Sequence, residues 1–421
     1  MDIHHLGTFD VENYGDLLYP IVLCHLLLTR DPSLRIRQYS LLPGEAPHGA
    51  GFETHAIRDL FLNSPGEPLR LVIGGGDILR TDWNNLARHY GRHSRITRGW
   101  LRHSIGTAGL FGYRMRQRLP RQDAADFYAR RFKARWMDYP AAGPFLITPE
   151  ALPSSTVVHY VSCGVPHLFR AVDEDAVKQA LDGGRSIYLR DQQSAEKLRT
   201  TGVSCKIHVA PDLAVLLSDQ FDHATEALRG RQILSKMGLL GDRPVLCFQS
   251  QPYPGFSTEE INDQLQRYRE RAGADVVLLP LGYCHGDHEF LQRLAAQSGG
   301  TCKYAPVDSI FDAISIIAAS DVFVGTSLHG NITAFSYGIP HLLGPLPVDK
   351  AEGFLQVTNL PPQLKLDSWR EIDDKLDLVR DLGRPFFLER ARAAKSQVRK
   401  VLDDVFENLL EPGLPLSASC A

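Results

Sequence analysis

Short apolar runs alternate with helical patterns along most of the chain, which is typical of parallel α/β architecture. The alternation begins again after a polar stretch at residues 218–241. One expected helix, at 309–319, carries Ile310, Ile314 and Ile317 on a single face. The predicted strands lie at residues 3–6, 34–39, 69–73, 157–161, 187–189, 207–209, 245–249, 276–279, 322–325 and 341–343.

This double series predicts two Rossmann-like domains that face each other across a cleft. The length of 421 residues fits two or three domains at roughly 150 residues each. We expect an N-terminal domain at 1–217, a C-terminal domain at 218–372, and a helical segment with a loose tail at 373–421. Ligands in such sheets bind beyond the carboxyl ends of the strands, so residues that directly follow strands are candidates for a site.

The composition is that of a globular protein, with 43% hydrophobic residues and a formal charge of -3. The charge is unevenly spread, because residues 83–140 hold 13 Lys+Arg against 3 Asp+Glu, a net +10 that leaves -13 for the remainder. We expect this basic insert in the first domain to be mostly helical. It has three interpretations: a solvated hairpin packed on the first domain, a surface for an anionic membrane or acidic acceptor, or a nucleic-acid contact. The near-neutral total argues against the last, so no nucleic acid is expected as a partner.

The N-terminal residues, the apolar stretches and the cysteine pattern indicate in which cellular compartment the protein is expected. Residues 1–5 lack a basic region followed by an apolar run, so we expect no signal peptide. The apolar stretch at 17–28 is shorter than the roughly 20 residues that span a bilayer. Seven scattered cysteines without a C-x-x-C pair favour neither a disulfide framework nor a zinc ribbon. The sequence therefore predicts a cytoplasmic protein.

The clearest local motif follows the strand at 322–325. Ser327, Leu328, His329 and Gly330 are expected at the N-terminus of a short helix. Free backbone amides and the helix dipole favour a phosphate or carboxylate there. A histidine at this position can act as general acid or base. The alternative is that the ring only caps or packs the helix.

Two further strand ends carry glycine and charge. Gly75, Gly76 and Asp77 follow the strand at 69–73; the glycines let a backbone approach a ligand closely, and Asp77 could hold a hydroxyl. The spacing lacks the G-x-G-x-x-G dinucleotide pattern, so NAD is not expected. Arg190 ends the strand at 187–189 and could clamp a carboxylate or phosphate with two hydrogen bonds, although a structural ion pair is the alternative.

The first strand is followed by Asn13, Gly15 and Asp16, which could face the cleft or only shape a turn. Asp16 is expected to cap the next helix. The strand at 276–279 is followed by Gly282 and His285. The Cys, His and Asp residues around His285 have no standard ligand spacing, so no metal is expected.

Taken together in this order, these segments resemble the polysaccharide pyruvyl transferase family. The resemblance spans roughly residues 1–345 without the basic insert, and it implies a GT-B-like fold with a terminal helix that returns to the first domain. The matching segments are 13–16, 73–77, 189–191, 210–212, 282–287, 327–330 and 338–340.

The resemblance implies transfer of the enolpyruvyl group of phosphoenolpyruvate onto two hydroxyls of a sugar. The product would be a pyruvate ketal on a cell-surface polysaccharide, such as an exopolysaccharide, or on its lipid-linked precursor at the inner face of the cell membrane. Phosphoenolpyruvate is then a donor substrate, and no cofactor is expected. His329 and Arg190 match the family's functional histidine and arginine, and Asp16 or Asp77 could position or deprotonate the sugar hydroxyls. Several members carry arginine where this chain has Ser327, which can hydrogen-bond a phosphate but cannot neutralise it.

Two other functions remain open on the sequence. A GT-B nucleotide-sugar glycosyltransferase shares the fold, but many such enzymes hold the ribose with an acidic residue in the helix before the late Gly-x-Pro. Residues 331–337 contain no carboxylate. The other alternative is an inactive, glycan-binding family member. The sequence does not identify the acceptor sugar, the position or stereochemistry of the ketal, or the oligomeric state.

Overall fold

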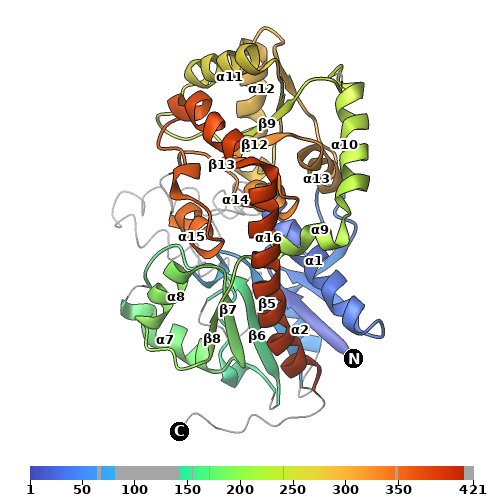
Figure 1. Cartoon of the computed structure of the whole chain (residues 1–421). Coiled ribbons are helices and arrows are strands. Elements are labelled where there is room, and N and C mark those ends of the chain that lie inside the picture. Colours follow the sequence, from blue (N-terminus) through green and yellow to red (C-terminus); the bar gives the residue numbers. More distant parts are fainter. Residues whose placement is uncertain are drawn as a thin grey trace, which may run out of the picture.

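Two separate sheets organise the chain, and buried strands alternate with helices in both (Figure 1). The basic insert at 83–140 lies outside the described residues, so its helical content and its partners stay predictions. The computed structural model describes residues 1–63, 68–80, 143–153, 155–169, 171–239, 241–346 and 349–411.

The first sheet has eight strands in the order β3-β4-β2-β1-β5-β6-β7-β8. Its neighbours run parallel except for β3, which pairs antiparallel with β4. Leu6 is in register with both Tyr39 and Ile73, so these three strands end at a similar level. The bounds are β1 (Asp2–Leu6), β2 (Arg35–Ser40), β3 (Gly44–Glu45), β4 (Glu53–Ala56), β5 (Arg70–Gly76), β6 (Val157–Cys163), β7 (Ser186–Leu189) and β8 (Ile207–Val209).

Helices α1 (Tyr14–Arg30), α2 (Ile57–Asn63), α7 (Ala171–Asp182) and α8 (Gln192–Arg199) belong to this first half. The expectation that Asp16 caps α1 is wrong. The cap is Asn13, whose side chain accepts a hydrogen bond from the Gly15 amide. The helix therefore begins earlier than expected, and Asp16 lies within its first turn.

The second sheet has five strands in the order β11-β10-β9-β12-β13, all parallel. Ser309 caps the helix that begins at Ile310, because its side chain accepts a hydrogen bond from the Phe311 amide. The strands are β9 (Val245–Gln249), β10 (Asp275–Leu278), β11 (Cys302–Tyr304), β12 (Val322–Gly325) and β13 (His341–Leu343). The accompanying helices are α9 (Leu217–Gln220), α10 (His223–Lys236), α11 (Thr258–Ala272), α12 (Asp287–Gln297), α13 (Ile310–Ala318), α14 (Leu328–Ser336) and α15 (Asp349–Val357).

The long helix α16 (Ile372–Leu410) runs from the second half of the molecule to the first (Figure 1). Gly383 adopts φ 65°, and this non-helical residue kinks the helix. Near its end, Asp403 pairs with Arg30 at 2.7 Å, and the Leu409 carbonyl accepts from Arg70 Nε at 2.9 Å. A terminal helix that returns to the first half is the arrangement that the resemblance implies.

The ten strands predicted from the sequence are present, with ends shifted by up to about three residues; β3, β4 and β11 were not predicted. No described helix is both apolar enough and long enough to cross a membrane. The division at residues 217 and 372 stays a prediction.

Candidate active site

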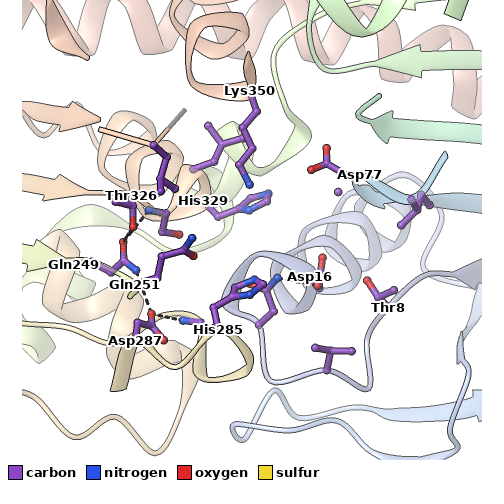
Figure 2. A pocket seen from close by; sticks show the side chains of 18 of the residues that line it. Thr8, Asp16, Asp77, Gln249, Gln251, His285, Asp287, Thr326, His329 and Lys350 are labelled. Atoms are coloured by element: carbon purple, nitrogen blue, oxygen red, sulfur yellow. Dashed lines mark hydrogen bonds between the residues drawn. The ribbon is translucent and has the colours of Figure 1, made fainter. Parts of the chain in front are cut away.

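A cavity of about 390 Å³ opens where the carboxyl ends of strands from both sheets meet (Figure 2). Most of its lining comes from segments that directly follow β1, β5, β7, β9, β10 and β12. This is the place where ligands bind in sheets of this kind. Ten of the thirteen residues predicted for the site line the cavity: Asn13, Asp16, Gly76, Asp77, Arg190, Gly282, His285, Ser327, Leu328 and His329.

The N-terminus of α14 forms one wall of the cavity. Ser327 caps the helix, because its Oγ accepts a hydrogen bond from the Gly330 amide at 3.2 Å. Leu328 and His329 are the first two helical residues, so their amides have no acceptor within the helix. These amides and the helix dipole favour an anionic group at this wall.

His329 lies on this wall with its side chain only 12% exposed. Its Nε2 is 3.6 Å from Asp212 Oδ2 and 3.4 Å from the Tyr19 hydroxyl, and Tyr19 donates a hydrogen bond to the Asp212 carboxylate. Burial alone would raise the pKa of Asp212. The hydrogen bond and charge of His329, together with Arg190, hold that pKa below its ordinary value. An ionised carboxylate next to a ring nitrogen fixes the orientation of the imidazole.

Arg190 links two carboxylates below the cavity. Its Nη2 donates to Asp77 Oδ1 at 2.5 Å, and its Nη1 lies 3.7 Å from Asp212 Oδ2. Burial alone would raise the pKa of Asp77, but Arg190 lowers it below the ordinary value, with a smaller effect from Lys350. Gly164 leaves room for the pair, since a Cβ there would lie 2.4 Å from Asp77 Oδ1. The guanidinium is therefore engaged by protein carboxylates, and its contact with a substrate stays a prediction.

Asp16 is a third carboxylate at the cavity. Asn13 Nδ2 donates to its Oδ2 at 2.9 Å. Burial and, to a smaller extent, the charge of Asp77 raise the pKa of Asp16 to about 6, although His329 and Asn13 lower it. The backbone at residue 76 comes close to the Asp16 carboxylate, and glycine permits this approach. Gly76 adopts φ 76°, and a Cβ there would lie 3.2 Å from Asp16 Oδ1. A carboxyl group with this pKa can accept or donate a proton near neutral pH.

A comparison with models of known protein families shows to which family the chain belongs. The model of the family named polysaccharide pyruvyl transferase matches residues 130–343, just over half of the chain. The chain belongs to this family. It is therefore a transferase of polysaccharide biosynthesis, and the matched region contains Arg190, Asp212 and His329.

Solved structures share the fold at low sequence identity. UDP-N-acetylglucosamine 2-epimerase from Rickettsia bellii is 11% identical with a TM-score of 0.53, and the alignment covers 97% of this chain and 96% of that chain. The S. aureus MnaA–UDP structure is 10% identical with a TM-score of 0.52 and 97% coverage of both chains. The Neisseria meningitidis UDP-GlcNAc 2-epimerase bound to UDP-GlcNAc is 9% identical with a TM-score of 0.50, covering 97% of this chain and 100% of that chain. They confirm the GT-B-like fold of this family member. No curated protein sequence matches the chain.

Three predicted site residues of this pyruvyl transferase family member do not line the cavity: Gly15, Gly75 and Gly330. Each instead permits close packing behind it. A Cβ on Gly75 would lie 2.7 Å from the Tyr19 ring, and one on Gly330 would lie 2.5 Å from the Phe323 ring. A Cβ on Gly15 would lie 2.1 Å from Nδ1 of His329.

We expect Gly15→Ala to lower turnover by at least about tenfold, because the new methyl group displaces the His329 imidazole from Asp212. Steady-state kinetics with donor and acceptor measure this effect. Gly241→Ala is the matched control, since no atom lies within 4 Å of a Cβ at that position. Normal turnover of Gly15→Ala would show that the ring position is not critical.

The sequence missed several residues of the site. The motif at 210–212 contributes to the resemblance, yet no role was assigned to Asp212, although it follows β8 and the strand-end rule applied to it. Tyr19 lies inside α1, and no sequence motif marks it as a residue of the site. Lys350 also lines the cavity but follows no strand and lies beyond the family match. Further lining residues without a predicted role are Thr8, Val11, Ile78, Gln249, Gln251, Asp287, Thr326 and Leu346.

Asp287 has a structural position in this group. Its Oδ2 accepts hydrogen bonds from the amides of Leu281 and Gly282 at 2.8 and 2.6 Å, and from Gln249 Nε2 at 3.1 Å. The carboxylate thus fixes the turn that carries His285. Within the described ranges, no group of three His, Cys, Asp or Glu side chains has an arrangement that could hold a metal ion.

Proposed function

We propose that this protein transfers the enolpyruvyl group of phosphoenolpyruvate to two hydroxyls of a sugar in a cell-surface polysaccharide or its lipid-linked precursor. The pair of Asp212 and His329 carries this proposal, because it presents a buried, oriented imidazole at the helix end that favours an anion. The family membership supports the same chemistry.

The first step is addition to the double bond of the donor. His329 donates a proton to the methylene carbon, which becomes a methyl group and leaves an oxocarbenium-like centre at the adjacent carbon. One sugar hydroxyl attacks that centre and loses its proton, which Asp16 accepts directly or through water. A carboxylate with a pKa of about 6 is suited to this exchange.

The second step closes the ketal. The bond between carbon and the phosphate oxygen breaks, and phosphate departs with the electron pair. The second sugar hydroxyl attacks the new oxocarbenium-like centre and gives its proton to His329, which restores the acid. The proton held by Asp16 passes to the departing phosphate, so that phosphate and a pyruvate ketal are the products. In this scheme Arg190 and Asp77 position the reacting side chains, because their own charges already compensate one another.

The direct test is isothermal titration of the purified protein with phosphoenolpyruvate and with a panel of nucleotide sugars. We expect phosphoenolpyruvate to bind and to release phosphate when a suitable glycan is added. If the protein binds a nucleotide sugar and does not bind phosphoenolpyruvate, the glycosyltransferase alternative is correct. The S. aureus MnaA–UDP structure, which has the same fold, is the reason for testing nucleotide sugars. Binding of a glycan alone would indicate an inactive member.

A pH profile tests the role of Asp16. Since burial raises its pKa to about 6, the base form is lost below that value, and we expect kcat/KM to fall as the pH drops through about 6. Asp16→Asn removes the titrating group, so the remaining slow activity should lack this acidic limb. Asp308→Asn, at an exposed carboxylate, is the control. An unchanged limb in Asp16→Asn would assign it to another group.

A further inference from the structure

A second cavity, of about 690 Å³, lies between the two halves of the molecule. Its lining comes from α8 in the first half, and from α15 and the segment 360–375 in the second. In Figure 1 this place is found where α15 lies above α8. Among the described residues, none lines both this cavity and the catalytic one. Its volume is within the roughly 300–1,000 Å³ of small-molecule sites, which often lie between domains.

Helix α15 separates the second cavity from the catalytic cavity. Glu352 and Gln356 are four positions apart on one helix face and line the second cavity. Lys350 lines the catalytic cavity and lies about 200° away from Glu352 around the helix axis. A Cβ on Gly353 would lie 2.9 Å from Asp191 Cβ, so α15 packs directly on the residue that caps α8. A ligand in the second cavity is therefore one helix away from the reacting groups.

The charges that line the second cavity cancel. The carboxylates of Glu352 and Asp367 balance the ammonium groups of Lys365 and Lys375. Lys365 pairs with Glu352 at 2.6 Å, and Lys375 Nζ donates to the backbone carbonyls of Gln363 and Lys365, both at 3.1 Å. Both ammonium groups thus have partners within the protein. The lining favours a neutral ligand over a phosphate or another anion.

Three glutamine side chains supply the hydrogen-bonding groups of the second cavity. Gln193 comes from α8, Gln356 from α15 and Gln363 from the turn at 362–364. Within the described ranges their side-chain amides form no hydrogen bond, so their donors and acceptors can serve a ligand. The buried side chains of Leu355 and Leu360 add apolar surface to the same cavity.

This combination matches the chemistry of a sugar. Each sugar hydroxyl both donates and accepts hydrogen bonds, as an amide side chain does with its two ends, and the C–H groups of the ring pack on apolar surface. We propose that the second cavity binds a neutral oligosaccharide segment of the acceptor glycan, beyond the sugar that reacts. This inference rests on the proposed function, which makes the acceptor a glycan. Contacts with a remote part of the substrate supply binding energy that holds the reacting sugar in place.

Isothermal titration of the full chain tests this site with neutral tetrasaccharides of glucose, mannose, galactose and N-acetylglucosamine. We expect the wild type to bind at least one of them. The double variant Gln193→Ala/Gln356→Ala should bind it about tenfold more weakly, the effect of losing the hydrogen bonds of two amides. Its affinity for phosphoenolpyruvate should not change, because neither residue lines the catalytic cavity. Gln266→Ala, at an exposed glutamine of α11, is the matched control, and thermal unfolding shows that each variant is folded.

The outcomes separate this inference from the proposed function. A wild type that binds none of the tetrasaccharides overturns the inference, and so does a double variant that binds them as tightly as the wild type. Tighter binding of a tetrasaccharide of galacturonic acid would contradict a neutral ligand. Weaker binding of phosphoenolpyruvate by the double variant would contradict the separation of the two cavities. If the wild type binds a neutral tetrasaccharide at this site but not phosphoenolpyruvate, the glycan site stands and the proposed function fails.

Discussion

His329→Ala is expected to lower turnover by roughly 10²- to 10⁴-fold, the usual contribution of a positioned acid or base. The physical reason is its position at the N-terminus of α14 with Nε2 next to the Asp212 carboxylate, which orients the ring toward the cavity. Phosphate release from phosphoenolpyruvate in the presence of acceptor measures the rate. The donor affinity should change much less than kcat, since the ring acts on the methylene carbon.

Two controls make this result specific. His167→Ala changes an exposed histidine and should leave kcat unaffected. Asp212→Asn keeps the shape but removes the charge that orients His329, so its kcat should fall in the same direction while donor binding persists. Near-normal turnover in folded His329→Ala would exclude this histidine as the acid.

The sequence predicts the fold well because the apolar pattern and the strand period are local signals. The strands around Leu71 and Val324 are continuous buried runs, as expected for parallel strands. The missed strands have two to four residues, and the outermost pair, β3 and β4, alternates or is exposed. Such short edge strands form through pairing with a neighbour, which the apolar pattern of the segment itself does not record.

The residues of the site also fall into two groups: those that the sequence predicts, and those that only the folded structure brings together. His329, Arg190 and Asp77 directly follow strands, so the topology rule for parallel sheets finds them. The hydrogen bond between Tyr19 and Asp212 joins residues that are 193 positions apart, and only the folded packing brings them together. The sequence also could not show that Arg190 is already paired with carboxylates.

The ion pairs of Arg190 hold the residues of the site in fixed positions. Asp77, Arg190 and Asp212 come from the ends of three different strands, and Tyr19 of α1 joins them through Asp212. The ion pairs therefore fix how these strand ends stand relative to His329. A substrate that enters the cavity meets groups held in place before it binds, which lowers the reorganisation needed for catalysis.

Removal of the central charge should have the largest effect on stability. We expect Arg190→Met to reduce the free energy of unfolding by about 3–5 kcal/mol, the cost of leaving a buried charge without its partner. The side chains of Arg190 and Asp212 are 4% and 3% exposed, so water cannot replace the lost interaction. Urea unfolding at pH 7 measures the change. Arg229→Met breaks an exposed pair with Asp312 and should cost no more than about 1 kcal/mol.

The pH dependence of the same variant identifies the cause. In the wild type the folded-state pKa values of Asp77 and Asp212 lie below their unfolded values, so the stability they contribute is present above about pH 4 and is lost as the pH falls further. Without Arg190, the pKa of Asp77 loses the largest effect that lowers it, and burial raises it, so the folded variant takes up a proton there more readily than the unfolded chain. The pKa of Asp212 rises less, because His329 still lowers it. The stability difference between wild type and Arg190→Met should therefore shrink as the pH is lowered from 7 to 5. A difference that stays constant over this range would mean that lost packing, and not the unpaired carboxylates, causes the destabilisation.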